Sequence, residues 1–185
     1  MRNLLQNILP TEKAEEIISI GKIKRIQPNE YFIRAGEIPR KLAFVFTGLF
    51  RYVYIDDNGN EFTKGIIQNN SFISSYSAMI SKSSSYFFIE AIEESEILEI
   101  SYDKWLVLLE SDAFWVKFLL RFVEKGFSIK EKRERDLLLL NAETRYVSFL
   151  KDFPGMEKRI KQTIIASYLG IQPESLSRIK KKFQS

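Results

Sequence analysis

The order of hydrophobic and polar positions divides the chain into three stretches with different periods. Between Ile23 and Ile100, short runs rich in Val, Ile, Phe and Tyr alternate with turn residues, which is typical of an antiparallel sandwich or barrel. The runs are Tyr31–Ile33, Leu42–Phe46, Phe50–Ile55, Phe62–Ile67 and Ile97–Ile100. Asn58-Gly59 predicts a tight hairpin because both residues tolerate positive φ, and Gly48 predicts a second tight turn.

A helical period replaces the strand pattern from Trp105 to Leu140, which contains no Pro and a single Gly, so we expect one long helix. An apolar stripe recurs along it at steps of three, four and seven residues: Trp115, Phe118, Phe122 and Ile129. Two interpretations of this stripe stay open. It packs on the barrel alone, or it pairs with its own copy in a second subunit, which would make these residues a dimer interface.

The last stretch predicts two short helices joined at Gly170, which is a helix-turn-helix pattern. Ala166, four residues earlier, suits a close crossing of two helices, and the backbone freedom of Gly170 suits a sharp turn. The second helix begins at Pro173 and places Leu176, Ile179 and Phe183 on its buried side. Before this unit, Asn141 to Asp152 predicts another helix, and residues 155–161 predict a linker.

Positive charge is concentrated on this last stretch. Residues 141–185 hold nine Lys or Arg and four Asp or Glu, a net of +5, whereas the whole chain is only +4. Basic charge beside a helix-turn-helix is the electrostatic footprint expected for contact with DNA phosphates. The candidate DNA-binding residues are Lys161, Thr163, Gln172, Glu174, Ser175, Arg178, Lys181 and Lys182.

The chain has no Cys and no His. This composition excludes His-dependent hydrolytic triads and metal sites built on thiolate or imidazole, so we predict no catalytic residue, no metal site and no cofactor. Carboxylate pairs such as Glu15-Glu16 and Glu93-Glu94 lie among polar neighbours and indicate solvated surface. No apolar run reaches the roughly 18 residues of a membrane span, and the first ten residues do not resemble a signal peptide. We therefore expect a cytoplasmic protein with no membrane partner.

The order barrel, long helix, helix-turn-helix resembles the Crp/Fnr superfamily of bacterial transcription factors over nearly the whole chain. Arg34–Pro39 and Phe44–Gly48 resemble the family's first barrel strands, and Ile97–Ser101 resembles its last. The resemblance implies an α+β fold: an antiparallel jelly-roll barrel of cyclic-nucleotide-binding type in residues 1–110, a dimerisation helix in 111–138, and a DNA-binding helix-turn-helix in 139–185. It also implies double-stranded operator DNA and a second copy of the chain as partners, with RNA polymerase as a further candidate.

The chain departs from the family where cyclic-nucleotide binders carry a Glu for the ribose and an Arg for the phosphate. The matching segments read Ser74-Ser75-Tyr76 and Ser84-Ser85-Tyr86, with neither group present. A buried phosphate would lack its charge-assisted bonds, so we expect no cyclic AMP or cyclic GMP in the usual mode. These six residues predict either a pocket for a neutral or weakly polar, unidentified effector or a polar loop without a ligand.

A second departure concerns the reading unit. We expect the family's β-hairpin wing after the recognition helix to be missing or vestigial. Pro173 stands where the family often has a base-reading Arg, while Glu174 and Arg178 match family positions that read bases. The prediction is a homodimeric regulator that reads a two-fold symmetric operator. A sensor acting through protein partners without specific DNA binding is the alternative, and an enzyme is a third option that the absence of His and Cys disfavours.

Overall fold

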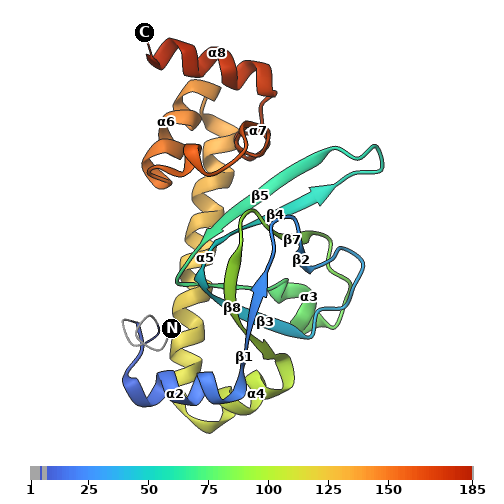
Figure 1. Cartoon of the computed structure of the whole chain (residues 1–185), viewed down its shortest axis with the longest axis vertical. Helices are drawn as coiled ribbons and strands as arrows, with labels where there is room; N and C mark the ends of the chain where they lie inside the picture. The colour runs from blue at the N-terminus through green and yellow to red at the C-terminus, as the bar shows by residue number, and fades with distance from the viewer. Residues whose placement is uncertain (1–4, 6–7, 185) are drawn as a thin grey trace.

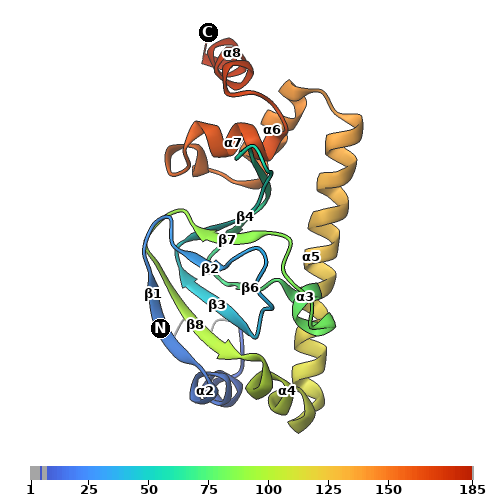
Figure 2. The same ribbon diagram turned by 90° about the vertical axis from the view of Figure 1, so that its right-hand side faces the viewer.

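A computed structural model of the chain describes residue 5 and residues 8–184. Two four-stranded antiparallel sheets face each other, a long helix runs along them, and three helices gather beyond one end of the sheets (Figures 1 and 2). The strands are β1 (Lys22–Ile26), β2 (Tyr31–Ile33), β3 (Lys41–Thr47), β4 (Leu49–Ile55), β5 (Glu61–Gln68), β6 (Ser71–Ile73), β7 (Phe88–Ala91) and β8 (Ser95–Ser101). The predicted α+β fold with an antiparallel barrel is confirmed.

The strand orders are β1-β8-β3-β6 in one sheet and β2-β7-β4-β5 in the other. All five runs identified from the sequence form strands, whereas β1, β6 and β7 were not predicted. The reason differs between them. The residues of β1 are mostly exposed, so its pattern lacks a buried face, and β6 and β7 have only three and four residues, too few to display a period of two.

Both predicted turns form, each with positive φ at its glycine. At the β4–β5 hairpin only Gly59 has positive φ (80°); Asn58 does not, and the Asp56 carboxylate instead accepts hydrogen bonds from the backbone N–H groups of Asn58 and Asn60. Gly48 between β3 and β4 has φ 116°, and a Cβ atom there would lie 2.0 Å from the Ser95 Oγ atom. The turn at Gly48 therefore requires both an unusual backbone and the absence of a side chain.

The helices before the C-terminal unit are α2 (Thr11–Ile20), α3 (Tyr76–Ser81), α4 (Tyr102–Ser111) and α5 (Ala113–Leu139). The prediction of one unbroken helix from Trp105 to Leu140 is wrong, because Asp112 is extended (φ −156°, ψ 132°) and separates α4 from α5. Its carboxylate accepts a hydrogen bond from the Phe114 backbone N–H, so it caps a new helix. Among the described residues, no helix is both long and apolar enough to cross a membrane.

The C-terminal unit comprises α6 (Ala142–Asp152), the 3₁₀ turn η1 (Met156–Lys158), α7 (Gln162–Leu169) and α8 (Pro173–Gln184). The three predicted helices are thus confirmed, with Asn141 capping α6 by accepting from the Thr144 backbone N–H. The expected linker is more ordered than the sequence suggested, since Met156 and Ile160 are buried among α6, α7 and α8. Leu49 and Ile66 of the barrel join the same cluster, so the unit packs directly on the sheets.

We predict that Gly48→Ala destabilises the fold by about 3 kcal/mol or more, because the new methyl group collides with Ser95 in addition to the backbone strain. Urea unfolding followed by circular dichroism measures the loss. Gly36→Ala is the matched control: its φ is also positive (88°), but no atom lies within 4 Å of the added Cβ, so only about 1 kcal/mol is expected. Equal losses in the two variants would contradict the collision at Ser95.

Candidate functional site

The turn between α7 and α8 has the geometry that a helix-turn-helix requires. Gly170 adopts the left-handed conformation (φ 66°, ψ 40°) and its N–H donates to the Ser167 carbonyl. The Ile171 N–H donates to the Ala166 carbonyl at 3.0 Å, which completes a Schellman motif at the end of α7. Ala166 is fully buried where the helices meet, as its spacing from Gly170 predicts.

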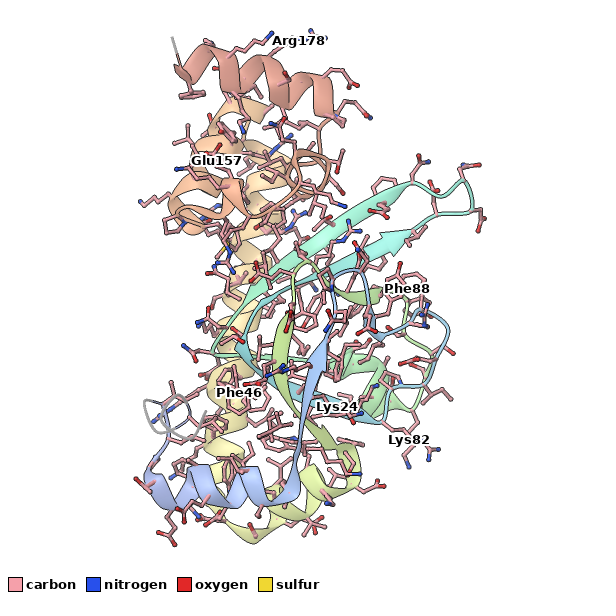
Figure 3. The ribbon with its side chains drawn as sticks, viewed as in Figure 1. Lys24, Phe46, Lys82, Phe88, Glu157 and Arg178 are labelled. Atoms are coloured by element: carbon pink, nitrogen blue, oxygen red, sulfur yellow. The ribbon has the colours of Figure 1, made fainter. Side chains whose placement is uncertain are left out.

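Helix α8 divides into a buried and an exposed face. Leu176 and Ile179 are buried beneath it, whereas Glu174, Arg178 and Lys181 share one exposed side at steps of four and three residues. Arg178 lies at the far end of the molecule and points away from the rest of the chain (Figure 3). Within residues 5 and 8–184, neither Arg178 nor Lys181 makes an ion pair, so both cations are available to a partner.

Other basic residues of the C-terminal unit form ion pairs with acidic residues of the same chain. Lys182, a predicted DNA contact, pairs with Glu143 of α6 at 2.8 Å, and Lys180 pairs with Glu157 at 3.0 Å. Arg159 pairs with Glu93 in the loop before β8. These bonds orient α8 and η1 and neutralise part of the positive charge that the sequence count assigned to the surface.

The remaining predicted DNA contacts differ in exposure. Lys161 and Thr163, at the start of α7, and Gln172, in the turn, are exposed, but Ser175 is half-buried. Ser177, which the sequence analysis did not select, is exposed instead. Its place three residues after Glu174 and next to Arg178 was the signal that could have identified it.

Arg133 of α5 connects the barrel to the C-terminal unit. Its guanidinium donates to the carbonyl of Thr63 at 2.7 Å and of Lys64 at 3.0 Å, both in β5, and to the carbonyl of Tyr168 in α7 at 2.8 Å. It also lies 4.3 Å from the centre of the Tyr168 ring. One side chain therefore holds three elements that are far apart in the sequence.

Ser167 forms a second link between β5 and α7. Its hydroxyl donates to the Glu61 carbonyl at 2.8 Å and accepts from the Thr63 backbone N–H at 2.7 Å. Figure 2 shows the β4–β5 hairpin reaching up to α7 beside these contacts. The orientation of the helix-turn-helix is thus set by the barrel as well as by α5.

A cavity of about 300 Å³ lies between the barrel and the middle of α5. Helix α5 contributes Phe118, Leu119, Phe122, Val123 and Gly126 to its lining. The remaining lining residues are Leu42, Tyr52, Phe72, Ile73, Ser74, Tyr76 and Trp105. None of them is charged. Burial raises the pKa of the Tyr52 hydroxyl to about 12.

Comparisons with known proteins agree with this architecture. Residues 23–112 match the cyclic nucleotide-binding domain family. The chain is similar in structure to the c-di-GMP responsive global regulator CLP from Xanthomonas campestris, with a TM-score of 0.76, 18% identity, and coverage of 94% of this chain and 91% of CLP. It is also similar to FixK2 from Bradyrhizobium japonicum, with a TM-score of 0.78, 16% identity, and coverage of 89% and 85%.

A third similar structure is a Eubacterium rectale protein assigned to the crp/fnr family of transcriptional regulators, with a TM-score of 0.74 and 20% identity. The coverage is 97% of this chain and 86% of that protein. The chain has the Crp/Fnr fold. No curated protein matches its sequence.

The two segments that match the nucleotide-binding cassette of the Crp/Fnr fold, Ser74–Tyr76 and Ser84–Tyr86, contact each other through only some of their side chains. The Ser85 hydroxyl donates to the Ser75 hydroxyl at 2.9 Å, and both serines are buried. Ser84 and Tyr86 are exposed, Tyr86 to 84%, so the prediction that these two line a pocket is wrong. Of the six predicted pocket residues, Ser74 and Tyr76 line the cavity.

The two faces of α5 are used differently in this Crp/Fnr fold. Trp115 is fully buried and Phe118 is 8% exposed, because both pack on Phe72, Trp105 and the rest of the barrel core. Of the two interpretations that the sequence left open, packing on the barrel therefore holds for Trp115 and Phe118, and their assignment to a dimer interface is wrong. Phe122 is half-buried in the same aromatic cluster, and Ile129 is 54% exposed.

The opposite face of α5 carries a second apolar stripe that the sequence analysis did not separate from the first. Its members are Val116, Leu120, Val123 and Phe127, which are between 47% and 65% exposed. Their steps of four, three and four residues match the seam of a coiled coil. A contiguous exposed apolar stripe on a long helix indicates a surface that a partner covers.

Several of the described carboxylates, Glu16 among them, are used in structural contacts. Glu16 accepts from the Trp115 indole N–H at 2.9 Å, and the Lys13 ammonium next to it holds the pKa of that carboxyl below its usual range. Within the described part of the chain, no group of three or more Asp or Glu residues could hold a metal ion.

We predict that Arg133→Met lowers the free energy of unfolding by about 2 kcal/mol, because backbone carbonyls of β5 and α7 lose their charged donor. Urea unfolding measures the loss. Arg135→Met is the control: among the described residues Arg135 pairs with its neighbour Asp136 alone, and its loss should change stability by less than about 1 kcal/mol. If both variants unfolded at the same urea concentration, the connecting role of Arg133 would be refuted.

Proposed function

We propose that this protein is a DNA-binding transcription regulator that reads double-stranded operator DNA through α8. The observation that carries the proposal is the exposed face of α8. Arg178 projects from the far end of the molecule (Figure 3), and the exposed Lys181 shares its side of α8. Neither makes an ion pair among the described residues, and their helix follows a Schellman-capped turn. A recognition helix in the major groove needs polar and Arg side chains toward base edges and Lys toward phosphates.

The proposal assigns base contact to Glu174, Ser177 and Arg178 and phosphate contact to Lys161, Thr163 and Lys181, with Gln172 in the turn. Ser175 is removed from the base-reading set because it is half-buried. Lys182 contributes less than its charge suggests, since Glu143 already holds its ammonium group. The similar structures of known transcriptional regulators support this assignment at the level of the fold.

A second copy of the chain is the partner that the outer stripe of α5 requires. Val116, Leu120, Val123 and Phe127 would form a two-fold symmetric seam in which each side chain meets its counterpart. Such a dimer would present its two α8 helices on one face. Each helix would read one half-site, with the half-sites about one helical turn apart, so we expect the operator to be an inverted repeat. Regulation of transcription would take place in the cytoplasm, with RNA polymerase as the further partner.

We also propose that cyclic AMP does not control this regulator. The cassette positions lack a carboxylate and a guanidinium, and the buried hydroxyls of Ser75 and Ser85 bond to each other. A cyclic phosphate placed there would find no cation within Ser74–Tyr76 or Ser84–Tyr86 to balance its charge.

Specific DNA reading is tested by selecting bound duplexes from a random library and titrating the enriched sequence by fluorescence anisotropy. We expect Arg178→Ala to weaken binding to that sequence by about 1–3 kcal/mol and to relax the preference at one base pair, while Lys181→Ala weakens binding to all duplexes alike. Lys24→Ala is the control, because it removes the same charge on β1, remote from α8 (Figure 3). Failure to enrich any sequence, with equal losses for Arg178→Ala and Lys181→Ala, would favour a sensor that acts through protein partners.

The dimer is tested separately by sedimentation velocity. We expect wild-type protein to sediment as a dimer and Leu120→Glu to sediment as a folded monomer, because the new carboxylate would be buried against its own copy in the seam. Val107→Glu is the control: Val107 is 69% exposed on α4, outside the stripe. A dimer that survives Leu120→Glu would place the interface on another surface.

A further inference from the structure

The outer stripe of α5 continues beyond Phe127 with two charged residues. Its alternation of four-residue and three-residue steps leads from Phe127 to Lys130, Glu134 and Leu137. Lys130 and Glu134 are exposed in the protomer. After them the surface is apolar again, since Leu137 is 39% exposed and its neighbour Leu138 is 76% exposed. The two charges therefore lie between apolar parts of one continuous surface.

Neither charge has a partner within the protomer. In the part of the chain that the structure describes, no ion pair or side-chain hydrogen bond involves Lys130 or Glu134. Their spacing of four residues permits an ion pair along a helix, but a Lys that precedes a Glu is the less favourable order. By contrast, Lys132 on another side of α5 pairs with Asp136 and Asp152. Both Lys130 and Glu134 are thus available to a second molecule.

The surroundings of Lys130 favour a carboxylate from outside the protomer. The ammonium group of Lys64 in β5 lies 4.0 Å from the centre of the Phe87 ring. Burial lowers the pKa of Lys64, and the charge of nearby Lys130 lowers it further. Lys64 and Lys130 therefore repel each other, and neither makes an ion pair among the described residues. A carboxylate brought to Lys130 by another molecule would offset this repulsion.

We propose that Lys130 and Glu134 form two reciprocal ion pairs with a second copy of this chain. In each pair, Lys130 of one protomer meets Glu134 of the partner subunit. Two-fold symmetry generates the second pair from the first, because a contact between two positions is repeated with the subunits exchanged. In a parallel coiled coil, each seam residue enters a hole formed by four residues of the facing helix. The hole opposite Glu134 includes the preceding seam position, which is Lys130 of the partner subunit.

The ion pairs would act on the choice of partner more than on affinity. Desolvation of two charges in a seam roughly cancels their attraction, so a buried ion pair adds little net stability. A facing helix with apolar residues or like charges at these two positions would leave Lys130 and Glu134 buried without a counter-charge, which is strongly unfavourable. A shift of one heptad has the same effect, because it brings Glu134 level with Phe127 of the facing helix. Lys130 and Glu134 therefore select a second copy of this chain, parallel and in register.

The test reverses each charge separately and then mixes the two variants. A homodimer of Lys130→Glu holds two carboxylates from each chain at these positions, and one of Glu134→Lys holds two ammonium groups from each chain. We expect either variant alone to dimerise roughly a hundredfold more weakly than wild type. An equimolar mixture restores opposite charges at both positions, and we expect it to sediment as a dimer. Sedimentation velocity of the full chains measures all samples, and circular dichroism verifies that each variant is folded.

Lys125→Glu is the matched control. Lys125 is exposed on the same helix, but it lies five residues before Lys130 and outside the steps of the seam. The same reversal of charge should leave its dimer as stable as wild type. If Lys125→Glu dissociated the dimer as strongly as Lys130→Glu, the effect would come from the net charge of α5, and the specific pairing would be refuted.

The inference rests on the proposed dimer, and its failure can be told apart from failure of that dimer. Unchanged dimers of both single variants, or variants that stay monomeric when mixed, would overturn the ion pairs. If Leu120→Glu still dissociated the dimer, the seam would stand without them. A monomeric wild-type protein would overturn both the dimer and the pairing, and would assign this face of α5 to a different partner. No DNA is present, so the outcome is independent of operator binding.

Discussion

The packing of one aromatic face of α5 on the barrel is the interaction on which the rest of the structure depends. Trp115 and Phe118 fill the space beside Trp105 and Phe72, and the Trp115 indole N–H is bound by Glu16 of α2. Because these large rings are buried within the protomer, the rotation of α5 about its axis is fixed. That rotation turns the stripe of Val116, Leu120, Val123 and Phe127 outward and leaves Gly126 at the cavity. The same helix then carries α6, α7 and α8 beyond the sheets (Figure 1).

Arg133 and Ser167 add a second constraint at the other end of α5. Both satisfy backbone groups of β5, and both also bind or belong to α7. The C-terminal unit is therefore joined to the barrel by hydrogen bonds to main-chain atoms. Leu49 and Ile66 of the barrel also contact the hydrophobic core of the C-terminal unit. A displacement of β5 or α5 would have to move α7, or else leave several polar groups without partners.

Charge in the C-terminal unit serves two purposes. Glu143 and Glu157 engage Lys182 and Lys180, and Glu93 engages Arg159, so part of the basic surface stabilises the arrangement of α6, η1 and α8. Arg178 and Lys181, which lack such pairs among the described residues, remain for a partner. The number of basic residues in this segment thus overstates the cations available for binding, because acidic residues of the segment and Glu93 outside it lie against three of them.

The sequence by itself determined the order of elements, the helix-turn-helix and the loss of the charged nucleotide cassette, because each depends on residues close together in the chain. Gly170, Ala166 and Pro173 lie within eight residues, and hydrogen bonds between neighbours close their turn. Only the tertiary structure decided which face of α5 is buried. Apolar residues surround the first half of that helix, so its periodicity favoured the aromatic face for the dimer, whereas the barrel covers that face. The cavity, the Arg133 contacts and the pairing of Lys182 with Glu143 likewise join residues 35 to 84 positions apart, and packing rather than local pattern brings such residues together.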